Sequence, residues 1–332
     1  EQFVDNFPNE EAHLTGEEIH RRLDEIEQIH AIYSPARLGL AAAIACCAFT
    51  FLLGGGPIEM MLAFIAAGIG NLIRTKLIKH HFTLFLNIAV SISASCFIYA
   101  ALLKIAEMAF NVPSIHEAGY ICSMLFIIPG FPFITSGIDL AKLDLRSGLE
   151  RLAYAIIIVM VATMFAWIMA LLLRLQPMDF EDLDLGPVLH LILRLIMSFF
   201  GVFGFSIMFN SPASMAATAA LIGAIANSLR LELVDLTGMP APAAAFAGAL
   251  TAGLLASFIK QNNGYPRISL TVPSIVIMVP GLYLYRAIYN FGIMALSDAV
   301  SWFASAIMII IALPLGLIFA RILTDKTFRY CT

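Results

Sequence analysis

Ten stretches of about 20 residues each consist almost entirely of apolar side chains, and no other feature of the chain restricts its fold as much. They cover residues 36–53, 57–74, 83–104, 117–138, 150–173, 187–208, 213–230, 241–260, 269–290 and 299–321. A helix of about 20 apolar residues crosses the hydrocarbon core of a bilayer, which is about 30 Å thick. The sequence therefore predicts an all-α, polytopic membrane protein with about ten transmembrane helices.

The composition excludes the common soluble classes of protein. Of the 332 residues, 60% are hydrophobic and 13% are charged, whereas soluble globular domains have about 45–50% apolar and about 25% charged residues. A soluble fold of this length could not bury that apolar excess, which excludes a soluble enzyme, a disordered chain and a secreted disulfide-rich protein. No basic patch indicates a nucleic-acid partner.

The basic residues indicate which ends of the helices face the cytoplasm. With the N-terminus placed in the cytoplasm, 14 lysines and arginines fall on the cytoplasmic side and 5 fall on the other side. Cytoplasmic loops of membrane proteins carry this kind of excess. We therefore expect a multi-pass protein of the inner or plasma membrane, with both termini in the cytoplasm.

The expected domain organisation begins with an acidic cytoplasmic tail. Residues 1–35 contain nine acidic and two basic side chains, and residues 15–34 have the apolar spacing of an amphipathic helix. A first five-helix half is expected over residues 36–175 and a second over 186–322. A short cytoplasmic tail over 323–332 completes the chain.

An internal repeat relates the two halves. The segment PIEMMLAFIAAGIGNLIR at 57–74 is similar to PASMAATAALIGAIANSLR at 212–230. Farther along, IIPGFPF at 127–133 matches MVPGLYL at 278–284, so the order is kept. Each half holds five apolar stretches, and an odd number of spans turns the second half over in the membrane. We therefore predict two inverted-topology repeats.

Two Pro-Gly pairs lie near the middle of matching apolar stretches. Pro129-Gly130 lies in the fourth stretch, where Pro132 adds a second break, and Pro280-Gly281 lies in the ninth. Proline removes a backbone donor and breaks a helix, which frees polar backbone groups that lipid cannot satisfy. Two matched breaks in inverted halves predict a substrate site at the bilayer midplane. The alternative is a pair of structural kinks.

Uncharged polar residues within the apolar stretches suit a zwitterionic or hydroxylated solute. Asn87, Asn210 and Asn227 are the candidates for hydrogen bonds to such a substrate. Polar side chains inside a membrane are costly and often functional. The alternative is that each one makes a hydrogen bond between helices.

Few ionisable residues lie in or next to the apolar stretches. Asp139, just beyond the broken fourth stretch, and Glu117, at its start, are the candidates for proton coupling. A solvated Asp139 paired with Lys142 or Arg151 is the alternative. No catalytic or metal-binding motif occurs, so we expect no enzyme, no cofactor and no metal site.

Four segments of the chain resemble the threonine/serine exporter family. They are FLLGGGPIEMMLAFIAAGIGNLIR (51–74), IIPGFPFITSGIDLAKLDLRSGLERL (127–152), GFSIMFNSP (204–212) and VPSIVIMVPGLYLYRAIY (272–289). The resemblance covers about residues 15–322. It implies ten helices in two homologous halves and export of small amino acids driven by the proton motive force.

The resemblance also assigns family positions in both halves. These positions are Pro129, Gly130, Pro132, Asp139, Asp144, Ser147, Gly148, Arg151, Asn210, Pro212, Pro273, Pro280, Gly281, Tyr285 and Arg286. Of the residues added in this way, Tyr285 joins the candidate substrate-binding set. Related proteins, in which the halves are separate chains, are linked to export of dicarboxylates such as succinate.

The sequence leaves three functions open. The first is a secondary exporter of threonine or serine that binds its substrate between the two broken helices and is coupled to protons. Its expected partners are the solute, protons and the lipid bilayer, with a second copy of the chain as a further candidate. The second is a dicarboxylate exporter, which needs positive charge at the midplane. Arg194 and Arg286 are the basic candidates, and both lie nearer the outer face, which favours a zwitterion. The third is a receptor or scaffold that binds a partner through residues 15–34.

Overall fold

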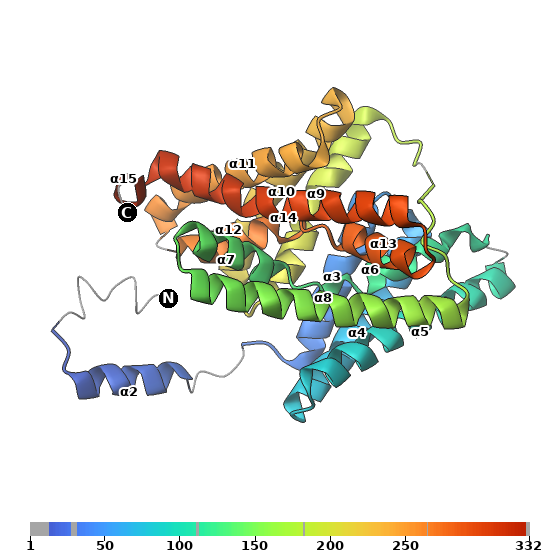
Figure 1. The fold of residues 1–332 in the computed structure, drawn as a ribbon, viewed down its shortest axis with the longest axis horizontal. Coiled ribbons are helices and arrows are strands. Elements are labelled where there is room, and N and C mark those ends of the chain that lie inside the picture. The colour runs from blue at the N-terminus through green and yellow to red at the C-terminus, as the bar shows by residue number, and fades with distance from the viewer. Residues whose placement is uncertain (1–12, 28–31, 111–112, 182, 264, 330–332) are drawn as a thin grey trace.

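The computed structural model describes residues 13–27, 32–110, 113–181, 183–263 and 265–329, and its regular elements are all helices (Figure 1). The α-helices are α2 (Gly16–Glu27), α3 (Pro35–Leu52), α4 (Pro57–Lys79), α5 (Leu84–Phe110), α6 (Gly119–Ser123), α7 (Gly130–Ala141), α8 (Leu145–Leu173), α9 (Pro187–Met208), α10 (Ala213–Thr237), α11 (Ala241–Asn263), α12 (Arg267–Val276), α13 (Gly281–Gly292), α14 (Leu296–Thr324) and α15 (Lys326–Arg329). Two short 3₁₀ helices, η2 (Ser114–Ala118) and η3 (Leu125–Ile127), flank α6.

The long helices coincide with the predicted apolar stretches. Among the described residues, eight helices are long and apolar enough to cross a membrane, and the number reaches ten if each of two bent pairs is one span. The bent pairs are His116–Ile127 with α7, at 54°, and α12 with α13, at 47°. The all-α, multi-pass membrane fold is thus confirmed, and the breaks occur at the two Pro-Gly pairs.

The N-terminal amphipathic helix is shorter than predicted. The helix α2 ends at Glu27, residues 28–31 lie outside the described part, and Ile32–Ser34 are not helical. Ser34 instead caps α3 by accepting a hydrogen bond from the amide of Arg37, and Pro35 is well suited to the first turn. None of the side chains of α2 is buried, and Figure 1 shows this helix apart from the bundle.

Helix contacts repeat in the two halves. The helices α3, α4, α5 and α8 pack in sequence, with α7 on α8, and the same pattern joins α9, α10, α11 and α14, with α13 on α14. Between the halves, α3 packs on α9, while α7 lies against α14 as α13 lies against α8. The equivalent helices α8 and α14 run in opposite directions in Figure 1. The inverted orientation of whole halves stays a prediction, which this pair of directions favours.

Backbone turns repeat as well. Leu143, between α7 and α8, has φ +62°, and Met294, between α13 and α14, has φ +63°. The residue that follows each one donates its amide to a carbonyl five residues earlier, from Asp144 to Asp139 and from Ala295 to Asn290. His81, Arg174 and Asn210 end other helices in the same way, so what the two halves share is the position of this turn, between α7 and α8 and between α13 and α14.

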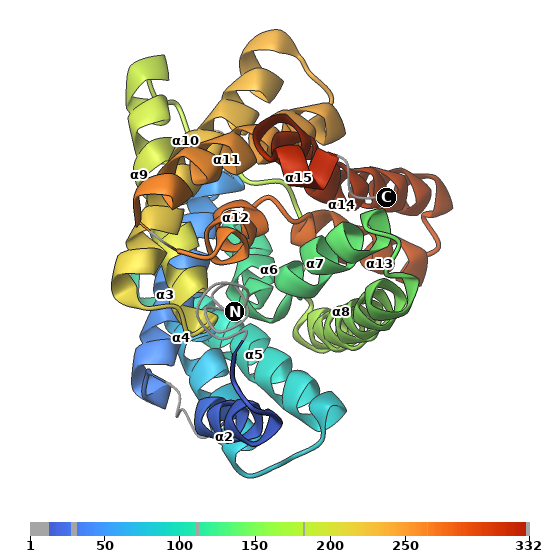
Figure 2. The ribbon, with the colours of Figure 1, turned by 90° about the vertical axis from the view of Figure 1, so that its left-hand side faces the viewer.

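The two bent pairs form the interior of the molecule. Figure 2 shows α6, α7 and α12 in the middle, surrounded by the longer helices. Every residue of α6 is buried, as are Leu270–Val276 of α12. The Pro-Gly breaks are thus enclosed by protein, as broken helices at membrane depth must be.

Candidate functional site

The two Pro-Gly breaks have the same backbone geometry. Pro129 has φ −81° and ψ 61°, and Pro280 has φ −80° and ψ 56°. In each break the glycine amide donates to the carbonyl two residues earlier, with an N–O distance of 2.8 Å in both. This is an inverse γ-turn, which ends one half-helix and begins the next.

The breaks also contact one another. A Cβ built on Gly130 would lie 2.5 Å from Cγ2 of Val276, at the end of the other half-helix. A Cβ built on Gly281 would lie 3.0 Å from Cδ2 of Leu125 and 3.2 Å from Cγ1 of Ile128. Glycine therefore permits the close approach of the two breaks, one from each half of the chain.

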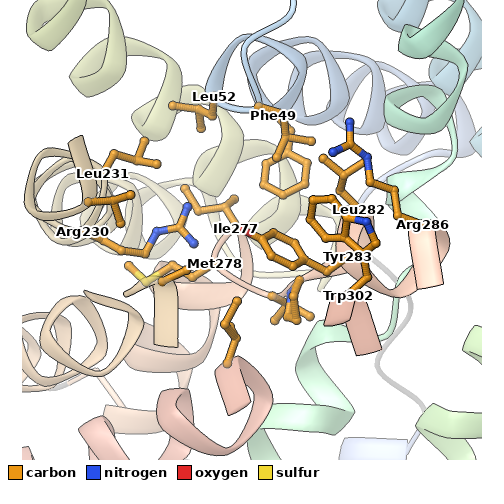
Figure 3. Close-up of a pocket in the computed structure, with 17 residues that line it drawn as sticks. Phe49, Leu52, Arg230, Leu231, Ile277, Met278, Leu282, Tyr283, Arg286 and Trp302 are labelled. Carbon is orange, nitrogen blue, oxygen red and sulfur yellow. The ribbon is translucent and has the colours of Figure 1, made fainter. Parts of the chain in front are cut away.

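A cavity of about 240 Å³ lies beside the second break. Residues Ile277–Leu282 line it together with side chains from α3, α10 and α14. Figure 3 shows Arg230, from α10, on one side and Arg286, from α13, on the other. The Nε atoms of both guanidinium groups are buried and have no hydrogen-bond partner among the described residues. The cavity thus has two sources of positive charge and free donors.

Arg286 is held at the edge of this cavity by three groups. Its Nη2 lies 2.7 Å from Oδ1 of Asp179 and donates to the carbonyl of Met178 at 3.3 Å. Its Cζ lies 4.8 Å from the ring centroid of Trp302, a cation–π geometry. Asp179 is 89% exposed while the side chain of Arg286 is 11% exposed. The ion pair is therefore open to water on its carboxylate side.

Two further cavities share Arg286 with the first as a lining residue. One of about 410 Å³ is lined by Asp179, Arg194 and Asp235, and another of about 350 Å³ by Asp179 and Asp298. Arg286 lines all three. Arg194 is neutralised by Glu232, at 2.7 Å, and by Asp235. Arg194 does not line the first cavity, whose two cations are Arg230 and Arg286, the latter paired with the exposed Asp179.

Two tyrosines join the halves next to the site. Oη of Tyr120, on α6, lies 2.6 Å from Oη of Tyr285, on α13, and both side chains are fully buried. Their rings meet edge to face, with centroids 5.8 Å apart. Tyr285 directly precedes Arg286, so this hydrogen bond links the first broken helix to the wall of the cavity.

Replacement of Tyr285 by phenylalanine is expected to destabilise the fold, since it leaves the buried hydroxyl of Tyr120 without its partner. A buried unsatisfied hydroxyl costs about 1–3 kcal/mol. Thermal unfolding of the purified protein in detergent should show a lower midpoint for Y285F and a smaller loss for Y120F/Y285F. The exposed Tyr154→Phe is the control, and a midpoint of Y285F equal to that of wild type would contradict the expectation.

The three candidate asparagines lie in different places. Asn87, on α5, accepts a hydrogen bond from Ser91, and Asn227, on α10, donates to Ser198 on α9. Asn210 lies in the exposed α9–α10 turn with φ +64° and accepts from the amide of Ile32. None of the three is among the residues that line the cavities described above. Of the three, Asn227 makes the hydrogen bond between helices that the structural alternative describes, and its buried Oδ1 has no partner among the described residues.

The predicted ionisable candidates also lie away from the cavities. Oδ2 of Asp139 lies 2.7 Å from Nη1 of Arg151, so it joins α7 to α8 at the end of the bent pair. Oε2 of Glu117 accepts the amide of Gln176 at 3.2 Å. Asp144 lies in the turn between α7 and α8, near the Asp139–Arg151 pair, and hydrogen bonds from Ser147 lower its pKa. The family positions Asp139, Asp144, Ser147 and Arg151 thus make contacts that hold the junction between α7 and α8.

The remaining candidates surround the breaks. Pro132 lies within the first turns of α7, and Pro129 directly precedes that helix. Gly130 borders a small gap between the two breaks and does not line the cavity beside the second break. Pro280 and Gly281 do line the larger cavity. Sequence reasoning missed Arg230 as a site residue, although its repetition as Arg74 was the signal that could have found it.

Comparisons with known proteins match nearly the whole chain. Residues 1–173 match the family model ThrE, described as a threonine/serine exporter, and residues 194–323 match a second model, described as "Threonine/Serine exporter, ThrE". No solved structure matches.

Two curated relatives carry the name "Probable succinate transporter subunit YjjP". That of Escherichia coli (strain K12) is 28% identical over 153 residues, which are 46% of this chain and 57% of the relative. That of Klebsiella aerogenes is 25% identical over 158 residues, which are 48% of this chain and 58% of the relative. The match thus covers somewhat more than half of each relative's length. Since the two family models together cover both halves, the chain belongs to the threonine/serine exporter family.

Proposed function

We propose that the protein is a secondary active exporter of small amino acids, with threonine and serine as substrates, in the inner or plasma membrane. The observation that carries the proposal is the cavity beside the second break, where Arg230 and Arg286 present unpartnered Nε donors. Family membership supports export, and the cavity supplies a place for the carboxylate of the solute. Both termini are cytoplasmic in this proposal, and the cavity opens toward the outside.

The break offers partners for both charges of an amino acid. A guanidinium group binds a carboxylate with charge-assisted hydrogen bonds. No described backbone amide donates to the carbonyls of Ile277 and Met278, because Pro280 lacks an N–H group and the amide of Gly281 donates to Val279. These carbonyls suit the ammonium group, so the substrate binds across the second break.

A dicarboxylate exporter is the second candidate, and the charge of the cavity lining is the observation that supports it. Two guanidinium groups border the cavity, while its described lining contains no acidic side chain. Arg230 lines the cavity together with the residues of the break. Its guanidinium group supplies the positive charge that the sequence analysis did not place there. The curated relatives, which are named for succinate, agree with this candidate.

Counterflow in proteoliposomes tests both candidates. Vesicles loaded with unlabelled threonine, serine or succinate are diluted into the same labelled solute, and uptake is followed. Uptake of threonine and serine supports the amino-acid exporter, and uptake of succinate alone supports the second candidate. Absence of counterflow with all three, compared with protein-free vesicles, would contradict transport of these solutes.

A further inference from the structure

A buried carboxylate–imidazole pair lies outside the substrate cavity. Oε1 of Glu59, on α4, lies 2.6 Å from Nδ1 of His116, on η2. The side chains of Glu59 and His116 are 4% and 13% exposed, respectively. The other carboxylate oxygen, Oε2, accepts the amide of Gly56 at 3.0 Å. The pair is therefore enclosed by protein apart from a small exposed part of His116.

The surroundings leave the charge of Glu59 without another cationic partner. In the ranges that the structure describes, His116 is the only basic side chain that forms an ion pair with Glu59. The titratable or polar groups near the pair on neighbouring elements are Tyr99 of α5 and Cys122 of α6, with Cys46 and Thr50 of α3 next to Cys122. The carboxylate of Glu117, which follows His116, instead accepts the amide of Gln176. A buried carboxylate without a partner is costly, so Glu59 depends on His116 and on the amide of Gly56 for its stabilisation.

The polypeptide approaches this pair closely. The hydroxyl of Tyr99 donates to the carbonyl of His116 at 2.7 Å. A Cβ built on Gly119 would lie 3.0 Å from Cβ of Glu59 and would overlap the ring of Tyr99. Glu59, Tyr99, η2 and the start of α6 are thus in close contact with one another.

A short path leads from the pair to the substrate cavity. His116 and Tyr120 are four residues apart in the first half of a bent pair, which extends over His116–Ile127. Tyr120 is hydrogen-bonded to Tyr285, and Arg286 follows Tyr285 in the cavity wall. The path from His116 to Arg286 thus consists of the helical segment up to Tyr120, the hydrogen bond from Tyr120 to Tyr285, and the peptide bond from Tyr285 to Arg286.

We propose that Glu59 and His116 together bind the proton that drives the transport cycle. The inference rests on the proposed export function and replaces the sequence-based candidates Asp139 and Glu117. With the proton bound, the pair is either an imidazolium facing a carboxylate or a carboxylic acid facing a neutral imidazole. Loss of that proton leaves one negative charge on Glu59, with neutral His116 donating from Nδ1. In the orientation proposed above, the pair lies toward the outside, from which an antiported proton enters.

Two assays on each variant in proteoliposomes test the assignment, with whichever of threonine or succinate wild type transports. The first is counterflow at equal pH on both sides, which needs binding and conformational exchange but no driving force. The second is accumulation driven by an imposed pH gradient. Glu59→Gln keeps the size of the side chain and can still accept from the Gly56 amide, while His116→Gln removes the imidazole. Glu107→Gln, which affects a carboxylate paired with Lys104 on α5, is the matched control.

We expect the variants of the pair to lose gradient-driven accumulation while they retain counterflow. E59Q and H116Q retain counterflow within about threefold of wild type and lose at least tenfold of the gradient-driven accumulation, whereas E107Q keeps both. Full gradient-driven accumulation by E59Q, or its loss in E117Q or D139N but not in E59Q, would overturn the assignment. Loss of counterflow in both E59Q and H116Q would also overturn it, because the pair would then serve folding or substrate binding.

Failure of the proton-site assignment can be distinguished from failure of the proposed export function by measurements on wild-type protein. Absence of counterflow in wild-type protein contradicts transport itself. Wild-type counterflow without any response to the pH gradient leaves transport standing and refutes proton binding at this pair.

Discussion

Replacement of Arg286 by glutamine is expected to reduce counterflow by about 100-fold. A hydrogen bond to a charged group contributes about 1.5–3 kcal/mol, and about 2.7 kcal/mol corresponds to a 100-fold change in affinity. Arg286 lines all three cavities and has a free Nε, so we expect it to be the main ligand of the substrate carboxylate. Its partner Asp179 is exposed and remains solvated without it, so the fold should persist.

Initial counterflow rates over a range of substrate concentrations measure this effect. Arg286→Lys keeps the charge but not the planar donor fork, so its loss should lie between those of wild type and R286Q. Arg146→Gln, at an exposed position on α8, is the control. A rate of R286Q equal to that of wild type would contradict the assignment of the cavity. Arg230→Gln separates the candidate substrates, because a second guanidinium matters more to a dicarboxylate than to an amino acid.

Replacement of Gly130 by leucine is expected to abolish measurable counterflow and to lower the unfolding midpoint. The new side chain begins at a Cβ only 2.5 Å from Val276 and would separate the two breaks. Overpacking in a closely packed interior costs about 1–3 kcal/mol. Gly281→Leu should have a similar effect, because its Cβ would contact Leu125 and Ile128 of the other break.

The matched control is Gly186→Leu. A Cβ at Gly186 meets no atom within 4 Å, and its φ of −58° is accessible to any residue. Thermal unfolding and counterflow of the three variants therefore distinguish the effect of the break from that of adding a leucine. Counterflow by G130L at the rate of G186L would show that contact between the breaks is not required.

The helices and the breaks could be predicted from the sequence because both depend on local chemistry. A run of apolar residues specifies a membrane helix, and a proline at position 129 or 280 cannot donate the hydrogen bond that would continue one. The alternative weighed for Asp139, pairing with Arg151, is the contact in the structure. That pair closes a tight turn between adjacent helices, so nearness in sequence was enough to indicate it.

The contacts that shape the site depend on distant parts of the chain. Tyr120 and Tyr285 are separated by 165 residues, and Glu59 and His116 by 57. Nothing in the local pattern around either residue indicates its partner. Asn210 illustrates the converse: its polar side chain next to an apolar stretch suggested a ligand, but the local pattern did not indicate its positive φ or its hydrogen bond to Ile32, 178 residues away.

The left-handed turns at Leu143 and Met294 place two apolar residues in a conformation that glycine adopts more readily. Neither residue is glycine, although a side chain at positive φ carries a cost of about 1–2 kcal/mol. Because Leu143 is 82% and Met294 75% exposed, neither side chain contributes much packing in return. The two turns are therefore places where a change to glycine could make the protein more stable for purification without altering the arrangement of its helices.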